Sequence, residues 1–286
     1  MRKRTSTVIV ILMIVAGLSL LLYPTVSNYL KSLSYRRTIA NYVTSVEPMD
    51  DGRHEELLEA AQAYNERLSE RNEFMLLPSK EQQTEYDSLL NIDGSGIMGY
   101  VSIPKINVAL PVYHGTSDEV LQSGVGHLEG SSLPVGGPGT HSVLSAHTGL
   151  PSSRLFTDID HLVEGDSFTV QVLKETLVYQ VDQIQVVLPN EADALRIEPG
   201  EDYCTLLTCT PYGVNTHRLL VRGRRIVTPA QEEASSHIAE GALAPDNDRL
   251  TAGSSFLIAA LIMAALLTAA LLWRKRMWKR AKRLKK

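Results

Sequence analysis

Cysteine is scarce in this chain, which has only Cys204 and Cys209 among its 286 residues. Small disulfide scaffolds carry several bridges, so the chain does not belong to that class. The two cysteines are five residues apart, and an odd separation within a strand places side chains on opposite faces, where they cannot easily bond. We therefore expect two free thiols. Cys204 is expected to be a buried core residue, whereas a free thiol at Cys209 indicates a chemical function.

Metal-binding patterns are also missing from the sequence. The region between residues 97 and 228 contains six histidines: His114, His127, His141, His147, His161 and His217. None forms a His-x-His, His-x3-His or glutamate-flanked pair of the kind that binds zinc. We therefore expect no metal site and no other cofactor.

Basic residues are few outside the two ends of the chain. Arg2-Lys3-Arg4 stands at the start, and nine lysines and arginines lie between Arg274 and Lys286. The rest of the chain has 16 basic residues against 32 acidic ones. Such an acidic body repels nucleic acid, so we expect no nucleic-acid partner and interpret the basic ends as membrane-surface signals.

Two uncharged apolar segments lie beside these basic ends. Thr7–Tyr23 has 17 residues and Ser254–Trp273 has 20, and about 20 apolar residues suffice to cross a bilayer as a helix. Lysine and arginine gather on the cytoplasmic side. The sequence thus predicts a cell-membrane protein with two spans, both termini in the cytoplasm and an extracytoplasmic loop. A cleaved signal peptide is the alternative for the first segment.

The sequence divides into six predicted segments, in this order: a cytoplasmic start and first span at 1–27, a helical prefix at 28–96, a β-rich domain at 97–229, a flexible linker at 230–253, the second span at 254–273 and a basic tail at 274–286. In the prefix, His54–Leu68 repeats its apolar residues with a helical period. Ser79 and Gln82 predict a capping box for a helix over Lys80–Leu90.

Short β-type segments separated by turn residues fill the domain at 97–229. The predicted strands are Ile97–Ile103, Val108–Tyr113, Ser142–His147, Ser167–Leu173, Leu177–Leu188, Tyr203–Thr210 and His217–Val227. Short helices are predicted at Ser117–Gln122, Ser153–Ile159 and Ala192–Leu195. Seven or eight strands at this spacing predict a mainly β fold, a closed antiparallel barrel or a sandwich.

Cys209 lies at the end of a predicted strand, next to the turn that begins with Pro211. The next strand begins at His217, and the short connection lets the two strands pair antiparallel, with Arg218 near the level of Cys209. A guanidinium beside a thiol favours the thiolate and donates hydrogen bonds to an oxyanion formed by its attack. A cysteine nucleophile also needs a proton donor, usually histidine. From spacing alone, both His147 and His217 are candidates.

These residues resemble the sortase signature, a Thr-Leu-x-Thr-Cys sequence with an arginine downstream: Thr205-Leu206-Leu207-Thr208-Cys209 and Arg218. Four further segments are similar to class C sortases, the pilin polymerases of Gram-positive bacteria: Ile103–Ile106, Gly126–Pro134, Ser145–Pro151 and Thr210–Gly223. The resemblance covers residues of about 97–228 closely. It implies a closed sortase β-barrel.

The resemblance also implies a cysteine transpeptidase. Cys209 would attack the threonine carbonyl of an LPXTG-type sorting signal on a pilin or surface protein, break the Thr–Gly bond and form an acyl-thioester. A pilin lysine amine would then resolve the thioester. His147 would protonate the leaving amine and deprotonate the attacking one, Arg218 would hold the oxyanion or position substrate, and Thr208 and Thr210 would bind substrate.

One feature of class C sortases is missing from this sequence. These enzymes usually carry an Asp-Pro-aromatic lid before the barrel, and residues 28–96 contain no such tripeptide. We hypothesise that Met75, Leu76 and Leu77 form an apolar lid over Cys209. A simple turn between packed helices is the alternative.

Three other functions are compatible with the sequence. They are a sortase that anchors surface proteins to the peptidoglycan precursor, a non-catalytic membrane-tethered barrel that binds peptides, and an ordinary cysteine protease. The second span, the helical prefix and the segment Thr210–Arg218 favour pilus polymerisation.

Overall fold

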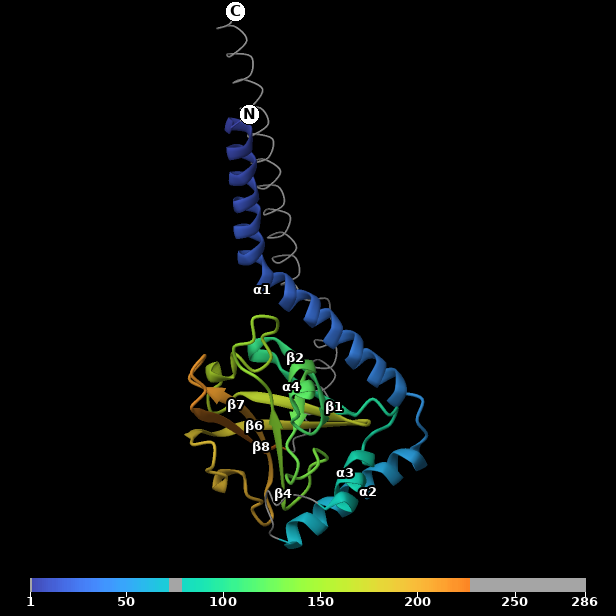
Figure 1. Cartoon of the computed structure of the whole chain (residues 1–286). Coiled ribbons are helices and arrows are strands. Elements are labelled where there is room, and N and C mark those ends of the chain that lie inside the picture. The colour runs from blue at the N-terminus through green and yellow to red at the C-terminus, as the bar shows by residue number, and fades with distance from the viewer. Residues whose placement is uncertain (1, 72–78, 227–286) are drawn as a thin grey trace, which may run out of the picture. The chain divides into compact units, whose positions relative to one another are not determined.

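The computed structural model describes residues 2–71 and 79–226, and their side chains from Met13 onward (Figure 1). These residues belong to one compact unit. The predicted lid at Met75, Leu76 and Leu77 lies outside the described residues, as do the predicted linker, second span and basic tail.

The first helix, α1 (Arg2–Val46), continues without a break from the apolar segment into the predicted prefix. Within the described residues, Met13–Val46 is the one helix long and apolar enough to cross a membrane. Figure 1 shows that α1 is bent partway along. Pro24 lies inside this helix, and a proline bends a helix because it lacks the N–H that the helical hydrogen bond needs.

The second half of α1 packs on the barrel. Ile39, Tyr42 and Val46 form a buried cluster with Ile97 and Tyr100. The Tyr42 hydroxyl donates a hydrogen bond to the Met98 carbonyl and accepts one from the Leu173 amide, both at 2.8 Å. Because each bond satisfies a buried backbone group, this part of α1 is an integral part of the folded domain.

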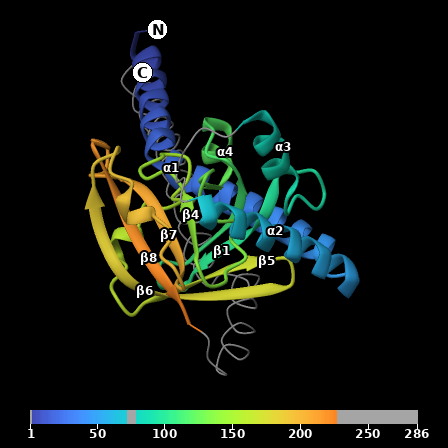
Figure 2. The ribbon, with the colours of Figure 1, turned by 90° about the horizontal axis from the view of Figure 1, so that it is seen from below.

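Two further helices follow, α2 (Asp51–Arg71) and α3 (Lys80–Ser88). The predicted capping box is confirmed: the Gln82 amide donates to the Ser79 hydroxyl at 3.3 Å, and the Ser79 amide donates to the Gln82 side chain at 2.7 Å. Figures 1 and 2 both show α2 and α3 on the side of the barrel away from β6 and β8.

Asn65 attaches α2 to the barrel, and its replacement by alanine tests that attachment. Its side chain is buried, donates to the Leu133 carbonyl at 3.0 Å and accepts from the Leu133 amide at 2.7 Å. An Asn65→Ala variant leaves the buried Leu133 amide unpaired, at about 1–3 kcal/mol, whereas the Leu133 carbonyl still accepts from the Val135 amide at 2.8 Å. We expect a clear fall in the free energy of unfolding by urea. Gln62→Ala, an exposed position on the same helix, should be neutral, and equal stabilities of the two variants would contradict the attachment.

Eight strands form the β-domain: β1 (Ile97–Ile103), β2 (Val108–His114), β3 (Val125–His127), β4 (Thr140–Ser145), β5 (Ser167–Val172), β6 (Glu175–Val187), β7 (Asp202–Thr210) and β8 (His217–Arg225). They close into a barrel in the order β1-β2-β3-β4-β7-β8-β6-β5. The predicted closed, mainly β barrel is confirmed. Between the strands lie α4 (Asp118–Ser123) and three single turns of 3-10 helix, η1 (Pro104–Ile106), η2 (Ile159–His161) and η3 (Asp193–Leu195).

The barrel differs from the sequence prediction in three ways. Two strand pairs are parallel, β2 with β3 and β4 with β7, because α4 and the β5–β6 hairpin are the crossovers that parallel neighbours require. The strand β3 was not predicted, since three residues are too short to show a period. The helix predicted over Ser153–Ile159 is absent there, and only the turn η2 follows.

The core fills the barrel from the inner faces of its strands. Leu144, Phe168, Leu206 and Val221 are fully buried. A Cβ at Gly223 would lie 2.7 Å from the Phe168 ring, so this position on β8 has room only for glycine. The packed interior leaves the outer face and the strand ends as the places where chemistry can occur.

Candidate active site

The hairpin of β7 and β8 brings Cys209 and Arg218 together. Their Cα atoms are partners in the antiparallel register, so the prediction that they lie at one level is confirmed. Partners in an antiparallel pair point to the same face of a sheet. The guanidinium and the thiol are therefore neighbours on one face, at the end of the barrel where β7 stops.

His147 reaches this level from the other side of β7. The strand β4 ends at Ser145, so the prediction that His147 ends the strand is wrong by two residues. Ser145 pairs with Leu207 in the parallel register, and the Ala146 amide then donates to the Leu207 carbonyl at 3.1 Å. These contacts continue the register beyond β4, and the next step places His147 beside Cys209.

Strand alternation identifies the face on which these residues lie. Leu206 belongs to the barrel core, whereas Leu207 packs in a separate cluster on the outer face. This outer cluster consists of Leu128, Val143, Val187, Ala194, Leu195, Leu207 and Leu220. Cys209 lies two residues after Leu207 and therefore points to the outer face, next to an apolar surface.

The two cysteines differ as the sequence predicts. Both are free, and Cys204 is completely buried in the core whereas Cys209 is half-buried. Burial raises the pKa of the Cys204 thiol well above its ordinary value. Cys204 is therefore an inert core residue, and only Cys209 can meet a substrate.

Arg218 is held by backbone carbonyls at the start of β8 and in the loop before it. Its Nη1 donates to the carbonyls of Asn215 at 3.3 Å and His217 at 3.1 Å. No carboxylate among the described residues forms an ion pair with it, in contrast to Arg222, which pairs with Asp182 at 2.9 Å. The Arg218 guanidinium is thus positioned by carbonyls and keeps its positive charge for an anion.

The remaining predicted residues lie on the other side of the sheet. The Thr208 hydroxyl is buried and donates to the Ala146 carbonyl at 2.7 Å, so it joins the ends of β4 and β7. The substrate contacts predicted for Thr208 and Thr210 stay predictions. Thr210 pairs with His217. Because neighbours on a strand point to opposite faces, His217 points away from Arg218. This geometry favours His147 over His217.

A contribution from the turn of the β7–β8 hairpin was not found by sequence reasoning. The Tyr212 ring lies against Gly149, where an added Cβ would be 2.9 Å from it. Gly149 has a φ of +75°, a left-handed conformation that favours glycine. Tyr212 and Gly149 therefore link the loop after Cys209 to the loop after His147, and nothing in either local sequence indicates this contact.

Two other histidines belong to the barrel structure. The Tyr86 hydroxyl and His127 Nδ1 are 2.9 Å apart, and His141 Nε2 lies 2.7 Å from the Thr205 hydroxyl. Burial disfavours the charged rings and lowers the pKa of each to about 4. Both are therefore neutral at pH 7.

These low values predict a loss of stability in mild acid. A histidine in the unfolded chain has a pKa of about 6.5, so the unfolded state takes up protons first as the pH falls. The contribution of the two buried neutral histidines to the free energy of unfolding is therefore complete above about pH 6.5. It is lost as the pH falls towards 4, at up to roughly 3 kcal/mol per histidine. We expect the thermal midpoint to fall across this range. His141→Gln should flatten the profile, whereas exposed His161→Ala should not. A flat profile for the unmodified chain would contradict the assignment.

A closed eight-stranded barrel with a cysteine at the end of β7, an arginine beside it on β8 and a histidine after β4 defines a sortase-type cysteine transpeptidase. The family model of the sortase domain matches residues 101–226. Sortase C1 from Streptococcus agalactiae is similar at 53% identity and a TM-score of 0.65, over 67% of this chain and 99% of that one.

Two further proteins agree with this assignment. Sortase C from Clostridium perfringens, solved with the C-terminal cell wall sorting motif, is 48% identical with a TM-score of 0.59, over 67% of this chain and 99% of that one. Sortase A of Bacillus anthracis is 25% identical over 234 residues, which are 81% of this chain and 99% of that protein. The chain belongs to the sortase family, and its structural neighbours confirm the resemblance to class C.

Proposed function

We propose that this sortase cleaves an LPXTG-type sorting signal between threonine and glycine and transfers the threonyl group to a pilin lysine, building covalent pili. The observation that supports the proposal is the register that brings Cys209 on β7, Arg218 on β8 and the segment after β4, which carries His147, to one level. The outer cluster beside them offers an apolar surface for the apolar residues of the signal. Sortase C of Streptococcus pneumoniae, 44% identical, was studied for its pilin substrate specificity.

These groups can perform the proposed reaction in two stages. The Cys209 thiolate attacks the threonine carbonyl, and the resulting oxyanion accepts hydrogen bonds from Arg218. Protonated His147 gives its proton to the departing glycine amine as the C–N bond breaks, leaving a thioester. The lysine amine then adds to the thioester, His147 takes its proton and the C–S bond breaks, which releases the isopeptide and restores the thiolate.

We further propose that the enzyme acts at the cell membrane. The apolar part of α1 supplies one anchor, and the second anchor at 254–273, the cytoplasmic termini and the extracytoplasmic barrel follow from the distribution of basic residues in the sequence. Met75, Leu76 and Leu77 stay the proposed lid over Cys209.

A product analysis tests the transferase function. The full chain in detergent is given an LPXTG peptide together with a lysine-bearing pilin subunit and a peptidoglycan precursor, and mass spectrometry records the products. We expect loss of the glycine fragment and a new isopeptide on the pilin. A hydrolysed peptide alone would indicate an ordinary protease, and transfer only to peptidoglycan precursor would indicate the anchoring sortase. An intact peptide would indicate a non-catalytic barrel.

A further inference from the structure

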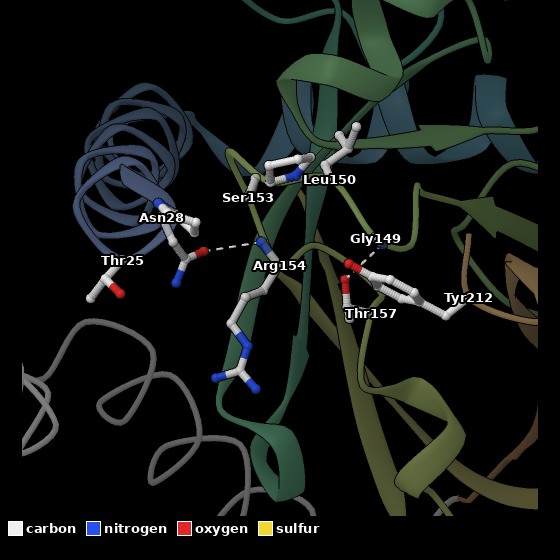
Figure 3. Close-up of a pocket in the computed structure, with 10 residues that line it drawn as sticks. Thr25, Asn28, Gly149, Leu150, Ser153, Arg154, Thr157 and Tyr212 are labelled. Carbon is white, nitrogen blue, oxygen red and sulfur yellow. Dashed lines mark hydrogen bonds between the residues drawn. The ribbon is translucent and has the colours of Figure 1, made fainter. Parts of the chain in front are cut away.

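A cavity of about 480 Å³ lies between α1 and the loop that follows His147 (Figure 3). Pro24, Thr25 and Asn28 form its wall on α1, and the opposite wall includes Arg154 and Tyr212. The cavity is next to the candidate active site, because Tyr212 follows Cys209 by three residues.

The two walls are joined by three hydrogen bonds. The Ser27 hydroxyl donates to the Ser152 carbonyl at 3.2 Å, the Arg154 amide donates to the Asn28 side chain at 3.0 Å, and the hydroxyls of Tyr35 and Ser153 lie 2.9 Å apart. The loop after His147 is therefore attached to the helix that carries the apolar span, and the position of the cavity along that helix is defined.

The exposed side of α1 indicates the depth of the cavity relative to the membrane. The uncharged apolar segment ends at Tyr23. Beyond it, Leu30 and Leu33 are still 58% and 37% exposed, although the opposite side of the helix packs on the barrel. Large apolar side chains on a helix continuous with a span are accommodated at the lipid boundary. With the apolar part of α1 in the bilayer, as proposed above, the turns of α1 that line the cavity lie at the level of the lipid headgroups.

The lining of the cavity suits a phosphate. No acidic side chain is among the described residues that line it. The Arg154 side chain is 65% exposed and pairs with Asp158 at 2.6 Å, and a guanidinium has five N–H donors, more than one carboxylate uses. The hydroxyls of Thr25 and Thr157 add further donors. Tyr212 is 67% exposed, and tyrosine rings are typical of the headgroup layer of membrane proteins.

We propose that this cavity is a docking site for the headgroups of the phospholipids around α1, with the phosphate at Arg154 and the Tyr212 ring in the headgroup layer. The proposal rests on the membrane anchoring given above. Its consequence is that the candidate active site, with Cys209 and His147, lies close to the membrane surface. Peptide substrates would then approach it parallel to the membrane.

Fluorescence quenching in a lipid bilayer tests this docking. Both natural tryptophans, Trp273 and Trp278, are replaced by phenylalanine in the full chain, and Tyr212→Trp supplies the single reporter. The chain is reconstituted in vesicles that contain phosphatidylcholine with a nitroxide on its headgroup. We expect a severalfold larger loss of fluorescence than for the control Lys174→Trp. Lys174 is next to Leu173, whose amide bonds to Tyr42. Tyr42 lies about 27 Å further along α1 than Pro24, so a tryptophan at position 174 is far from the headgroup layer.

The outcomes separate this proposal from the proposed function. Co-flotation of the chain with the vesicles tests the membrane anchoring. If the chain does not float with the vesicles, both the anchoring and the docking site are wrong. Co-flotation with equal quenching at 212 and 174 would overturn the docking site alone. A third outcome is that the tryptophan at position 212 shows no quenching by the nitroxide lipid and yet changes its fluorescence when an LPXTG peptide is added. That result would indicate a peptide site in the cavity and would also overturn the docking site. Arg154→Gln should reduce the quenching at 212, and unchanged quenching would contradict the phosphate site.

Discussion

Replacement of Cys209 by alanine is expected to abolish transpeptidation, with a loss of at least about a thousandfold in the rate of product formation. The physical reason is that the described residues offer no second nucleophile at this place. Cys204, the other thiol, lies inside the barrel, and burial raises its pKa well above the ordinary value. The measurement is the yield of hydroxamate from an LPXTG peptide and hydroxylamine.

Cys204→Ala is the matched control for this experiment. It removes the same group from the same strand but from the opposite face of the sheet. We expect a modest loss of stability, because the thiol fills space in the core, and a normal hydroxamate yield below the unfolding temperature. Hydroxamate formed equally well by Cys209→Ala would show that the thioester mechanism is wrong.

The second large effect is expected for His147→Ala, with a loss of about 10²–10⁴-fold in the rate of transfer. The contacts that continue the register of β4 and β7 bring the segment of His147 to the level of Cys209. We expect the histidine there to pass a proton to the leaving amine. The matched control is His217→Ala, whose side chain points away from Arg218. We expect this control to keep most of the activity.

The pair of variants decides which histidine serves Cys209. The rate of glycine-fragment release is followed for both variants across pH, and circular dichroism checks that each is folded. A large loss for His217→Ala with near-normal activity for His147→Ala would reverse the assignment. Equal and small losses would exclude both histidines as the proton donor.

The β7–β8 hairpin shows how much of the site could be predicted. Cys209 and Arg218 are nine residues apart, joined by one short connection, so a strand pattern and a turn are sufficient to place them at one level. The capping box at Ser79 was predictable for the same reason, since its two bonds span three residues. Where the deciding contacts are local, sequence patterns predict them.

His147 shows the limit of this reasoning. The bond between Thr208 and Ala146 joins residues 62 positions apart, and the strands that it connects are parallel neighbours separated by the whole β5–β6 hairpin. Residue spacing leaves His147 and His217 as alternatives, and at the level of sequence only the resemblance to the sortases favours His147. Strand β3 is not predictable from the sequence, because three residues are too few to show an alternating pattern. Only its pairing with β2 and β4 identifies it as a strand.

By itself, the sequence determined the apolar segment of α1, the run of strands, the free thiols and the pairing of Cys209 with Arg218, because each depends on periodicity or on a short connection. Only the tertiary structure decided that the segment of His147 reaches the level of Cys209, that the buried Thr208 hydroxyl bonds to Ala146 and that α1 holds the loop after His147. Those contacts join residues 62 to 126 positions apart. They form when the barrel closes and α1 packs on it, and no local pattern specifies that packing.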